Sequence, residues 1–580
     1  MIAMTLKKEP DLGSPALPWD DTFDTIVLGS GLAGLTAALV STIEGKKTLL
    51  LEKSAQIGGT SALSSGSTWI PNNSYQRKMG ITNDREVALT YLDALIGNRA
   101  DRALREAFLD AGPGMLAYLE EHIDLRWLMF DVQPDYEQSL PGATTGGRAL
   151  MPLPFDGRRL GKDFDLVRWP IPELMLFGGM MITRAEASRL LKLGRNLDSI
   201  LLGAQLCGRF ILDRLRYRRG TRLVLGNALV AKLLYHLIDH EAAIWINSRT
   251  AQLILENDRV CGAVVQCGGV EIRLRARQGI VLAGGGFPAS PELRERHFPK
   301  PAAQYTAACD GCTGDTLRLA QDIGASLGPP GQDNAFWFPS SIAERRDRST
   351  AVFPHIVLDR AKPGLIAVNS MGRRFCDEGS SYHKFVREMY RSHASIPSIP
   401  AWLVCDRRFV WKYGIGMIKP RTPFLKPFIS RGYLYAAGSV EALAEKIGVD
   451  GNGLSETIRT HNDFARTGVD TDFGKGSNAY DQAYGDPGHL PNPCLGPIDR
   501  PPFCAVAVFP TPLGTSLGLR TNTNAQVLES SEQPIKGLYA CGNDMHSILG
   551  GEYPGPGAQI GVGMVFGYLA AKHASGALDD

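Results

Sequence analysis

The sequence predicts an α/β fold in which a Rossmann-like domain is combined with a second, α+β domain. Two observations support the first part: the apolar run Asp24–Leu28 leads directly into a glycine-rich turn, and the apolar run Thr48–Leu51 ends in the acid Glu52. A third observation is that apolar runs followed by glycine clusters return far downstream, at 280–286 and 537–543. A chain of 580 residues is too long for one ordinary core, so we expect more than one domain.

The first unit follows the order strand, glycine-rich turn, apolar helix, strand and acid. In such a unit Gly29 permits the tight turn, Gly31 lets a pyrophosphate approach the backbone, and Gly34 lets the helix pack closely on the strand. The helix N-terminus that follows Ser30 presents N–H groups to an anion. Glu52, at the end of the second strand, is placed to accept hydrogen bonds from ribose hydroxyls. The unit therefore predicts a dinucleotide site.

A second glycine-rich stretch soon after the acid favours FAD over NAD as the dinucleotide. Gly58–Ser61 and Ser64–Gly66 follow Glu52 closely, and a further cluster at 555–563 opens the last predicted helix. The N-terminus of that helix can stabilise negative charge on a reduced flavin. No second dinucleotide motif for NAD(P) is present, so we expect electrons to leave to an external acceptor. Beyond the first turn, the predicted cofactor-binding residues are Glu52, Lys53, Gly59, Thr60, Ser61, Ser65, Gly66, Ala283, Gly284, Gly285, Gly542, Asn543, Gly557, Ala558 and Ile560.

Composition and charge are typical of a globular protein without a nucleic-acid partner. The chain is 44% hydrophobic and 21% charged, with a formal net charge of +2. Residues 1–20 contain no continuous apolar segment and are interpreted as a disordered lead-in rather than a secretory signal. The ten cysteines are interpreted as free thiols, which favours a reducing, cytoplasmic compartment. The eleven histidines show no HxxH or HExxH spacing, so no metal site is expected.

Nearly the whole chain resembles the fumarate reductase and succinate dehydrogenase flavoproteins, and within them the 3-ketosteroid Δ1-dehydrogenases. The most specific match is the segment Gly551–Gly561, which is similar to the YPGxG signature of that family. The segment Asn369–Glu378 followed by Tyr382 resembles the family's GxRFxNE stretch and the tyrosine after it. Pro134–Tyr136 resembles the segment that carries another tyrosine. One departure is Asp377, which stands where the family usually has asparagine.

The resemblance implies an FAD-dependent 3-oxosteroid 1-dehydrogenase and assigns four residues to the reaction. The hydroxyl of Tyr553 and the amide of Gly557 would hold the C3 carbonyl oxygen of the steroid. Tyr382 would be the base that removes the α proton, while flavin N5 takes the β hydride. Because a free tyrosine has a pKa of about 10, Tyr136 is expected to lower the pKa of Tyr382 by hydrogen bonding.

Three other functions remain open from the sequence. The same tyrosines would serve a desaturase of small cyclic ketones such as cyclohexanones. A fumarate-type reductase is disfavoured, because Tyr382 lies where those enzymes place an arginine proton donor and residues 552–559 contain no arginine. A flavoprotein that only carries electrons would bind FAD without being reduced by a ketone.

The predicted domain division is discontinuous. Residues 21–155, 226–300 and 505–580 are assigned to the FAD-binding domain, and 301–504 to a substrate-capping domain that supplies Tyr382. Residues 156–225 do not fit the minimal fold and are assigned to a helical, basic insertion.

The insertion is expected to form amphipathic helices. Between Arg184 and Arg219 it holds nine basic residues, Lys192 and Arg195 among them, against three acids. Leu190, Leu193, Leu197, Ile200 and Leu201 follow helical spacing, after a stretch rich in methionine and phenylalanine. One interpretation is contact with a membrane surface. The resemblance implies the same, since some family members with a comparable insertion are membrane-associated, and this would suit an apolar substrate and a quinone acceptor. The alternative is a helical hairpin packed on the FAD domain or at a dimer interface.

Overall fold

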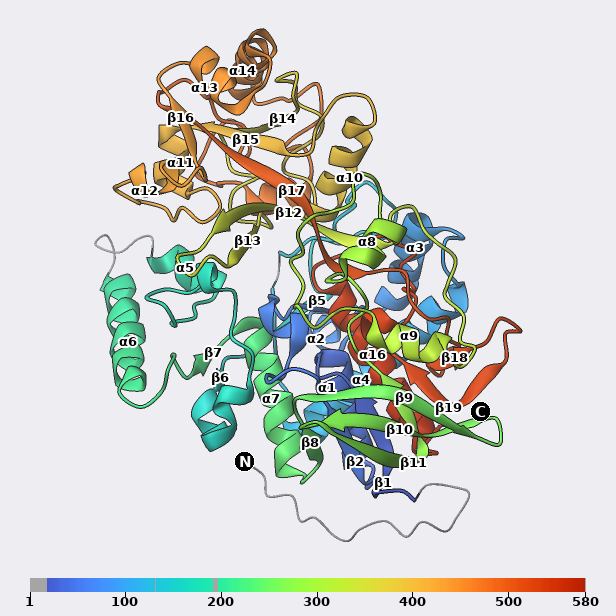
Figure 1. The fold of residues 1–580 in the computed structure, drawn as a ribbon. Helices are drawn as coiled ribbons and strands as arrows, with labels where there is room; N and C mark the ends of the chain where they lie inside the picture. Colours follow the sequence, from blue (N-terminus) through green and yellow to red (C-terminus); the bar gives the residue numbers. More distant parts are fainter. Residues whose placement is uncertain (1–17, 131, 191–196, 579–580) are drawn as a thin grey trace.

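The computed structural model describes residues 18–130, 132–190 and 197–578, and its largest sheet has eight strands. In Figure 1 this sheet lies in the lower part of the view, and β9 (Ser248–Glu256) pairs with β10. The order of the other strands across the sheet is β18 (Gln526–Leu528), β19 (Pro534–Ala540), β10 (Arg259–Cys267), β11 (Val270–Leu282), β1 (Asp21–Leu28), β2 (Thr48–Leu51) and β8 (Ala243–Trp245).

The central strands of this sheet run parallel and are buried. Leu28 at the end of β1 is paired with Leu51 of β2 and with Leu282 of β11, and Leu282 is also paired with Ala540 of β19. The four strands therefore end at the same edge, where open α/β sheets bind their ligands. The strand β10 runs antiparallel to β11, so the sheet is mixed.

Three helices pack together beside this sheet, namely α1 (Leu32–Ile43), α7 (Leu225–Asp239) and α16 (Ala558–Ala574). The approach of α16 to α1 depends on glycine: a Cβ on Gly567 would lie 2.5 Å from the carbonyl oxygen of Ala33. A smaller sheet is formed by β3 (Thr68–Trp69), β5 (Ala149–Pro152) and β4 (Trp127–Met129), and nearby lie α2 (Ser74–Lys78), α3 (Asp84–Ile96) and α4 (Arg102–Ile123).

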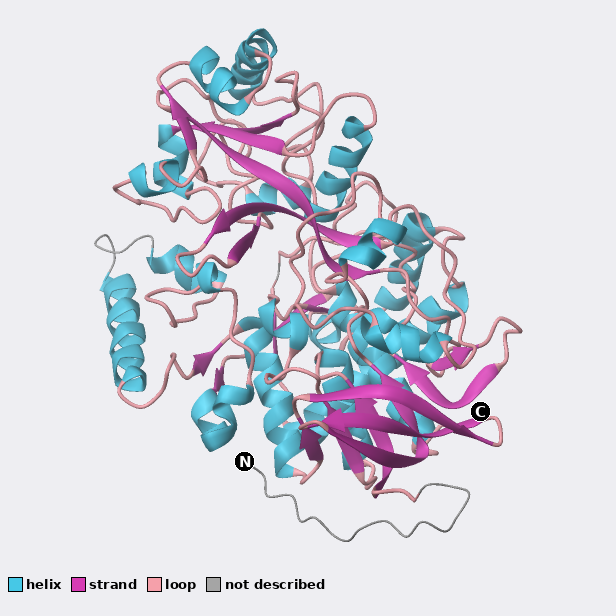
Figure 2. Ribbon diagram, in the orientation of Figure 1, coloured by secondary structure: helices cyan, strands magenta, loops and turns pink. Residues whose placement is uncertain are grey.

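The second domain is built on a separate six-stranded sheet (Figure 2). Its strands pair antiparallel in the order β13 (Thr350–Pro354), β12 (Ala335–Glu344), β17 (Phe503–Thr515), β15 (Ala401–Asp406) and β14 (Leu365–Val368), and β16 (Tyr435–Ala437) also pairs with β17. Its helices include α10 (Tyr382–His393), α11 (Arg407–Tyr413), α13 (Val440–Ile447), α14 (Gly451–Thr467) and α15 (Ala479–Tyr484). The predicted α/β fold with an α+β capping domain is confirmed. The predicted domain boundary at residue 505 falls inside β17, because that strand remains in the capping sheet as far as Thr515.

The predicted insertion contains two helices and several short elements. Phe155–Asp156 (β6) pairs with Arg222–Leu223 (β7) at its base, and α5 (Arg184–Leu190) and α6 (Leu197–Arg214) lie between them. In Figure 1, α6 stands at the margin of the molecule. The predicted helical positions Lys192, Leu193 and Arg195 lie outside the described residues, as do residues 1–17 of the predicted lead-in. Within the described part of the chain, every helix is too short or too polar to span a bilayer.

Candidate functional site

The predicted cofactor residues gather at the carboxyl edge of the large sheet. Gly29 follows β1, Glu52 follows β2, Ala283 follows β11, and Gly542 comes two residues after the end of β19. Since these four strands are parallel and in register, turns from four distant parts of the sequence meet there. The structure thus brings together the four groups that the sequence placed at a single dinucleotide.

The acid and the first turn are held in place by each other. The Ser30 hydroxyl donates to Glu52 Oε2 at 2.5 Å and accepts from the Gly58 amide at 3.1 Å. The Ser54 amide donates to Glu52 Oε1 at 2.8 Å. Glu52 is buried, and its carboxylate retains lone pairs for further donors. This arrangement fits the ribose-binding role predicted for it.

The side chain of Lys53 has different partners from that of Glu52, the residue before it. Its ammonium donates to Thr313 Oγ1 at 2.7 Å and pairs with Asp315 Oδ2 at 2.8 Å. Burial would raise the pKa of Asp315, but the charge of Lys53 outweighs it and lowers that pKa. Lys53 therefore joins the first turn to helix α9 (Asp315–Gln321), and its predicted contact with the cofactor stays a prediction.

Two helix N-termini at this edge have no side-chain cap, and both suit a dinucleotide. Gly31 caps α1 and Gly557 caps α16, neither with a side-chain hydrogen bond. A Cβ on Gly31 would meet only Ser61 Oγ, at 3.6 Å, whereas a Cβ on Gly29 would lie 2.3 Å from the carbonyl oxygen of Ala283. The space over Gly31 and the positive end of the α1 helix suit a pyrophosphate. The residues present therefore fit FAD.

The second glycine-rich stretch forms the 3₁₀ helix η1 (Gly59–Leu63) and the loop after it. Ser61 Oγ accepts from the Leu32 amide at 3.1 Å, which ties this stretch to the start of α1. Ser65 Oγ donates to Ser67 Oγ at 3.2 Å, and a Cβ on Gly66 would strike the backbone of Leu225. The stretch thus lines the same edge as the first turn.

Asp544 is a residue of this site that the sequence analysis missed. Its carboxylate accepts from the Gly284 amide at 2.6 Å and from the Gly286 amide at 2.8 Å, and it is fully buried. Asp544 therefore ties the glycine cluster after β11 to the 3₁₀ helix η4 (Gly542–Asp544). Its position next to the predicted residues Gly542 and Asn543 was the available signal.

The three predicted tyrosines form one buried cluster between the two domains. The Tyr136 hydroxyl donates to the Tyr382 hydroxyl at 2.8 Å. The ring centroid of Tyr553 lies 5.4 Å from those of both other tyrosines. Tyr553 also accepts a hydrogen bond from Gln559 at 3.3 Å. Three segments separated by more than a hundred residues thus place three phenols side by side, with the Gly557 turn four residues after Tyr553.

Burial has the largest effect on the pKa values of these three phenols. Burial and the neighbouring Tyr553 raise the pKa of Tyr382 well above its ordinary value, and the hydrogen bond from Tyr136 acts against that rise. Burial also raises the pKa of Tyr136 and of Tyr553. A fourth phenol that the sequence analysis did not single out, Tyr480, packs edge-on against Tyr136 with centroids 5.1 Å apart.

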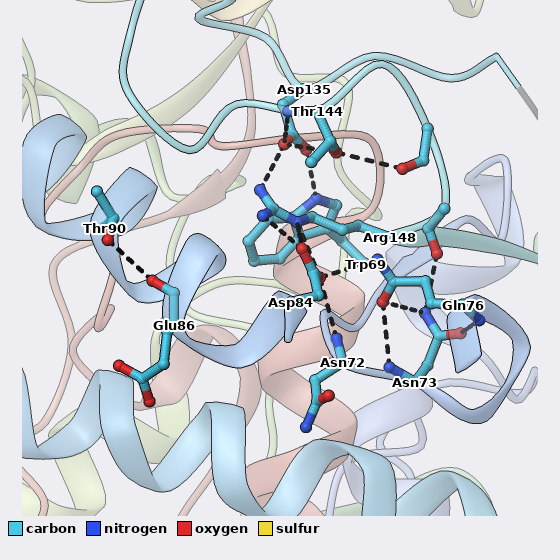
Figure 3. A network of polar contacts seen from close by, with 12 residues as sticks. Trp69, Asn72, Asn73, Gln76, Asp84, Glu86, Thr90, Asp135, Thr144 and Arg148 are labelled. Carbon is cyan, nitrogen blue, oxygen red and sulfur yellow. Dashed lines mark hydrogen bonds and ion pairs between the residues drawn. The ribbon is translucent and has the colours of Figure 1, made fainter. Parts of the chain in front are cut away.

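An ion-pair network beneath the cluster fixes the segment that carries Tyr136 (Figure 3). Arg148 lies between Asp84 and Asp135, 2.7 Å from an oxygen of each, and all three side chains are at most 2% exposed. Asp135 also accepts from Trp69 Nε1 at 2.8 Å. Because Asp135 directly precedes Tyr136, this network restrains the backbone from which the tyrosine projects.

Tyr91 and Pro554 connect the segments of two cluster tyrosines. The Pro554 carbonyl accepts from the Tyr136 amide at 2.9 Å and from the Tyr91 hydroxyl at 2.8 Å. The same hydroxyl accepts from the Glu137 amide at 3.2 Å. The backbone next to Tyr136 is thus bound to the backbone next to Tyr553.

Arg387 connects the helix that begins with Tyr382 to the residues just before Tyr553. It lies on α10, the helix that begins with Tyr382, and its Nη2 donates to the Gly551 carbonyl at 2.8 Å. Its guanidinium also pairs with Asp333, at 2.8 Å, and with Glu552. Arg387 therefore holds the α10 helix against the residues just before Tyr553.

Asp377, the residue that departs from the family pattern, lies near the buried Asp481: a Cβ on Gly379 would lie 3.1 Å from Asp377 Oδ1 and 3.0 Å from Asp481 Oδ1. Burial and the nearby Asp377 raise the pKa of Asp481 to about 8. Because the unfolded value is about 3.9, the folded chain keeps a proton that the unfolded chain loses between about pH 4 and 8. The pair therefore favours folding at low pH, and this contribution is lost as the pH rises toward 8.

Replacing Asp377 with asparagine is expected to stabilise the protein at pH 8. The substitution removes the like charge, so the gain should reach at least about 1.4 kcal/mol, the equivalent of one pKa unit, and should shrink at pH 5.5. Urea midpoints at the two pH values measure it. Asp472→Asn, at an exposed position nearby, serves as the control and should give no pH-dependent gain. A loss of stability at pH 8 would contradict the conclusion that Asp377 raises the pKa of Asp481.

Comparison with known proteins places these features in context. A family model described as FAD binding domain matches residues 24–560, which confirms the predicted cofactor. The chain is 34% identical over 564 residues to 3-oxosteroid 1-dehydrogenase of Mycobacterium tuberculosis, covering 95% of this chain and 98% of that one. It is also 34% identical over 553 residues to 4-oxocyclohex-2-ene-1-carboxylate 5-dehydrogenase of Sinomonas cyclohexanicum, covering 95% and 93%.

One solved structure supports the same relationship. The crystal structure of 3-ketosteroid delta1-dehydrogenase from Sterolibacterium denitrificans, in complex with 1,4-androstadiene-3,17-dione, superimposes with a TM-score of 0.89 at 38% identity. The match covers 96% of this chain and all of that one. These similarities confirm the resemblance inferred from the sequence signatures.

Proposed function

The chain belongs to the family of flavoproteins that share this FAD binding domain, and we propose that it desaturates a 3-ketosteroid between carbons 1 and 2. The observation that carries the proposal is the buried phenol cluster, in which Tyr136 and Tyr382 are hydrogen-bonded at 2.8 Å beside Tyr553. Relatives acting on cyclic ketones support the chemistry, since their names specify 3-oxosteroid or 4-oxocyclohexene substrates.

Two donors are proposed to hold the ketone oxygen. The hydroxyl of Tyr553 and the amide of Gly557, at the uncapped start of α16, would bind this oxygen and stabilise the negative charge that develops on it. A donor of this kind often contributes about 3 kcal/mol to the transition state. Stabilising this charge makes the neighbouring α proton easier to remove.

Tyr382 is proposed to remove that α proton as a phenolate. The hydrogen bond from Tyr136 stabilises the phenolate and spreads its charge over a second phenol. The bulk of the cluster excludes water from both. Bound FAD supplies the acceptor for the hydride that leaves the β carbon.

The positive charges near the cluster do not favour a dicarboxylate substrate. Arg387 and Arg99 both form ion pairs with Glu552, the residue before Tyr553. A fumarate-type site needs cationic groups that are available to two carboxylates. The proposal therefore retains a neutral ketone as substrate, with an external acceptor, proposed to be a quinone, receiving the electrons.

Anaerobic reduction of the bound flavin tests the function. Bleaching of the flavin absorbance by androst-4-ene-3,17-dione, faster than by 4-substituted cyclohexanones at equal concentration, is the expected result. Bleaching by the cyclohexanones alone would keep the reaction and replace the substrate class. Bleaching by neither would contradict the assignment as a dehydrogenase and leave a flavoprotein of another function.

Replacing Arg387 with methionine is expected to lower the rate of flavin reduction at saturating ketone by about 10- to 100-fold, because small displacements of reacting groups have effects of this size. Flavin content should be unchanged, since the cofactor residues lie elsewhere, and Arg387→Lys should restore part of the rate. Arg391→Met, one turn further along α10, is the matched control because Arg391 is 72% exposed and its ion pair is with Glu388 on the same helix. An unchanged saturating rate in Arg387→Met would show that the ion pairs do not position the tyrosines.

We also propose that α6 contacts a membrane surface. Its exposed positions 197, 200, 201, 204, 208, 211 and 212 fall on one face at helical spacing, and Leu197, Leu201, Ile211 and Leu212 are each more than half exposed. Apolar faces of this kind mark interaction sites, and the exposed Arg214 on the same helix suits anionic lipid. The packed-hairpin alternative is not favoured, because this face is uncovered in the described part of the chain.

Vesicle binding distinguishes the membrane from a second copy of the chain. Cosedimentation with phosphatidylglycerol-containing vesicles is expected, and the variant carrying Leu201→Ser and Ile211→Ser should lose it while keeping its flavin. The control is Val270→Ser, at an exposed apolar position on the large sheet. A dimer in solution that the double substitution dissociates, without vesicle binding, would instead assign the face to a second copy.

A further inference from the structure

Cys309 and Cys312 form a Cys-x-x-Cys pair that the interpretation of ten unrelated thiols overlooked. The two residues begin and end a tight turn, in which the Cys312 amide donates to the Cys309 carbonyl at 3.0 Å. A turn of this kind brings two cysteines within the range that a disulfide requires.

The pair lies against residues assigned to the cofactor site. The Cys309 amide donates to Thr60 Oγ1 at 3.0 Å, and the Cys312 thiol lies 3.5 Å from the same oxygen. A Cβ on Gly285 would lie 2.7 Å from Cys312 Sγ. The thiols therefore belong to the wall of the site, on the side formed by η1 and the turn after β11.

The two thiols differ in their surroundings. Cys309 Sγ accepts a hydrogen bond from the Gly311 amide at 3.4 Å. The hydrogen bond from Cys312 lowers the pKa of Cys309 to about 7 against the effect of burial, with Arg168 contributing. The pKa of Cys312 is raised, first by its hydrogen bond to Cys309 and then by burial. The Cys309 thiol is thus suited to attack first, and the Cys312 thiol is suited to react in the second step.

A second neighbouring pair in the same chain lacks these features. Cys405 and Cys504 are directly opposed on β15 and β17. Both are 0% exposed, whereas Cys309 and Cys312 each keep 5% of their surface. Burial raises the pKa of Cys405 and of Cys504, the latter to about 12. In both pairs the two cysteines are neighbours. The surroundings stabilise a thiolate only in the Cys309–Cys312 pair.

We propose that Cys309 and Cys312 are a reversible thiol–disulfide site whose oxidant is a small disulfide such as oxidised glutathione. The Cys309 thiolate attacks one sulfur of the small disulfide, whose S–S bond breaks and releases one thiol. Cys312 then loses its proton and attacks Cys309 Sγ, which releases the second thiol. The pair loses two electrons and two protons, and the small disulfide gains them as two thiols.

Thiol mapping of the flavin-containing protein tests the site. After incubation with oxidised glutathione, alkylation of the remaining thiols and peptide analysis should find one bridge, Cys309–Cys312, which dithiothreitol reverses. Cys405 and Cys504 should remain fully alkylated after unfolding. Ten free thiols after oxidation, or equal oxidation of the Cys405–Cys504 pair, would overturn the proposal.

Single substitutions separate the two roles. Cys312→Ser is expected to accumulate a stable glutathione adduct on Cys309, because the thiol that would displace glutathione is absent. Cys309→Ser should leave Cys312 unmodified. Retained flavin absorbance verifies that each variant is folded, and the wild-type mapping decides the question if either is not. A preference for Cys312 in these variants would overturn the assigned order.

The bridge is also expected to loosen the cofactor. Bond formation draws Cys312 Sγ toward Cys309 and away from Thr60 or Gly285, so the packing behind the site changes. Released flavin, measured by its fluorescence after dilution, should appear several-fold faster from the oxidised protein than from the reduced one. Cys309→Ser treated in the same way is the control, and equal release rates before and after bridge formation would overturn the coupling.

Discussion

Replacing Tyr382 with phenylalanine is expected to slow the reduction of the bound flavin by a ketone about 10²- to 10⁴-fold, the usual contribution of a positioned general base. The substitution removes only the hydroxyl, and the ring keeps its contacts with Tyr136 and Tyr553. Flavin content and thermal stability should therefore stay close to those of the unmodified protein. Stopped-flow absorbance under anaerobic conditions measures the rate.

Two further substitutions show whether the loss belongs to the base. Tyr136→Phe removes the donor at 2.8 Å but keeps the base, so its rate should lie between those of Tyr382→Phe and the unmodified protein. Tyr390→Phe, on the same helix as Tyr382 but outside the phenol cluster, should react normally. A Tyr382→Phe protein that is reduced at the normal rate would remove the central assumption of the proposed mechanism.

The pH dependence of the same rate follows from the burial of Tyr382. Burial raises its pKa well above 10, so only a small fraction is phenolate between pH 6 and 9. The phenolate fraction grows tenfold for each pH unit below the pKa, and the rate at low ketone concentration should therefore rise across this range without a plateau. Tyr136→Phe should lower the rate at every pH, because the hydrogen bond that favours the phenolate is lost. A rate that falls with pH would exclude a phenolate base.

The sequence was most informative where structure depends on neighbouring residues. The unit from Asp24 to Glu52 could be predicted because strand, glycine turn and helix start are all local features. The three tyrosines were found through family signatures, and their contact at 2.8 Å joins residues 246 positions apart. No spacing rule predicts such a contact, so the geometry of the cluster had to come from the structure.

The residues that support the cluster were harder to predict, for the same physical reason. Arg387 and Glu552 are 165 residues apart, and each looks like an ordinary surface charge in the sequence. Tyr91 lies in none of the family signatures, yet its hydroxyl donates to the Pro554 carbonyl beside Tyr553. The predicted boundary at residue 505 lies inside β17, which is one continuous strand from Phe503 to Thr515, and nothing in its local composition marks its extent.

Replacing Arg148 with methionine is expected to lower the free energy of unfolding by about 3–5 kcal/mol, the largest stability effect among these predictions. Arg148 is 1% exposed, and without its charge the buried carboxylates of Asp84 and Asp135 face each other uncompensated. A lower urea midpoint, followed by circular dichroism, measures the effect. Arg126→Met is the control, since Arg126 is 57% exposed and solvent weakens its pair with Asp124, so the urea midpoint should stay close to that of the unmodified protein.

Two conditions should recover the stability lost in Arg148→Met, and together they identify its cause. Burial raises the pKa of Asp135 even when Arg148 is present, so removing the guanidinium raises that pKa further. The folded variant then binds a proton that the unfolded chain releases, and its deficit should shrink as the pH falls from 8 to 5. Adding Asp84→Asn and Asp135→Asn should also restore part of the midpoint, because the uncompensated charges are gone. A deficit that neither acid nor the amides reduce would mean that Arg148 acts by packing against Trp69, at 5.9 Å, rather than by charge.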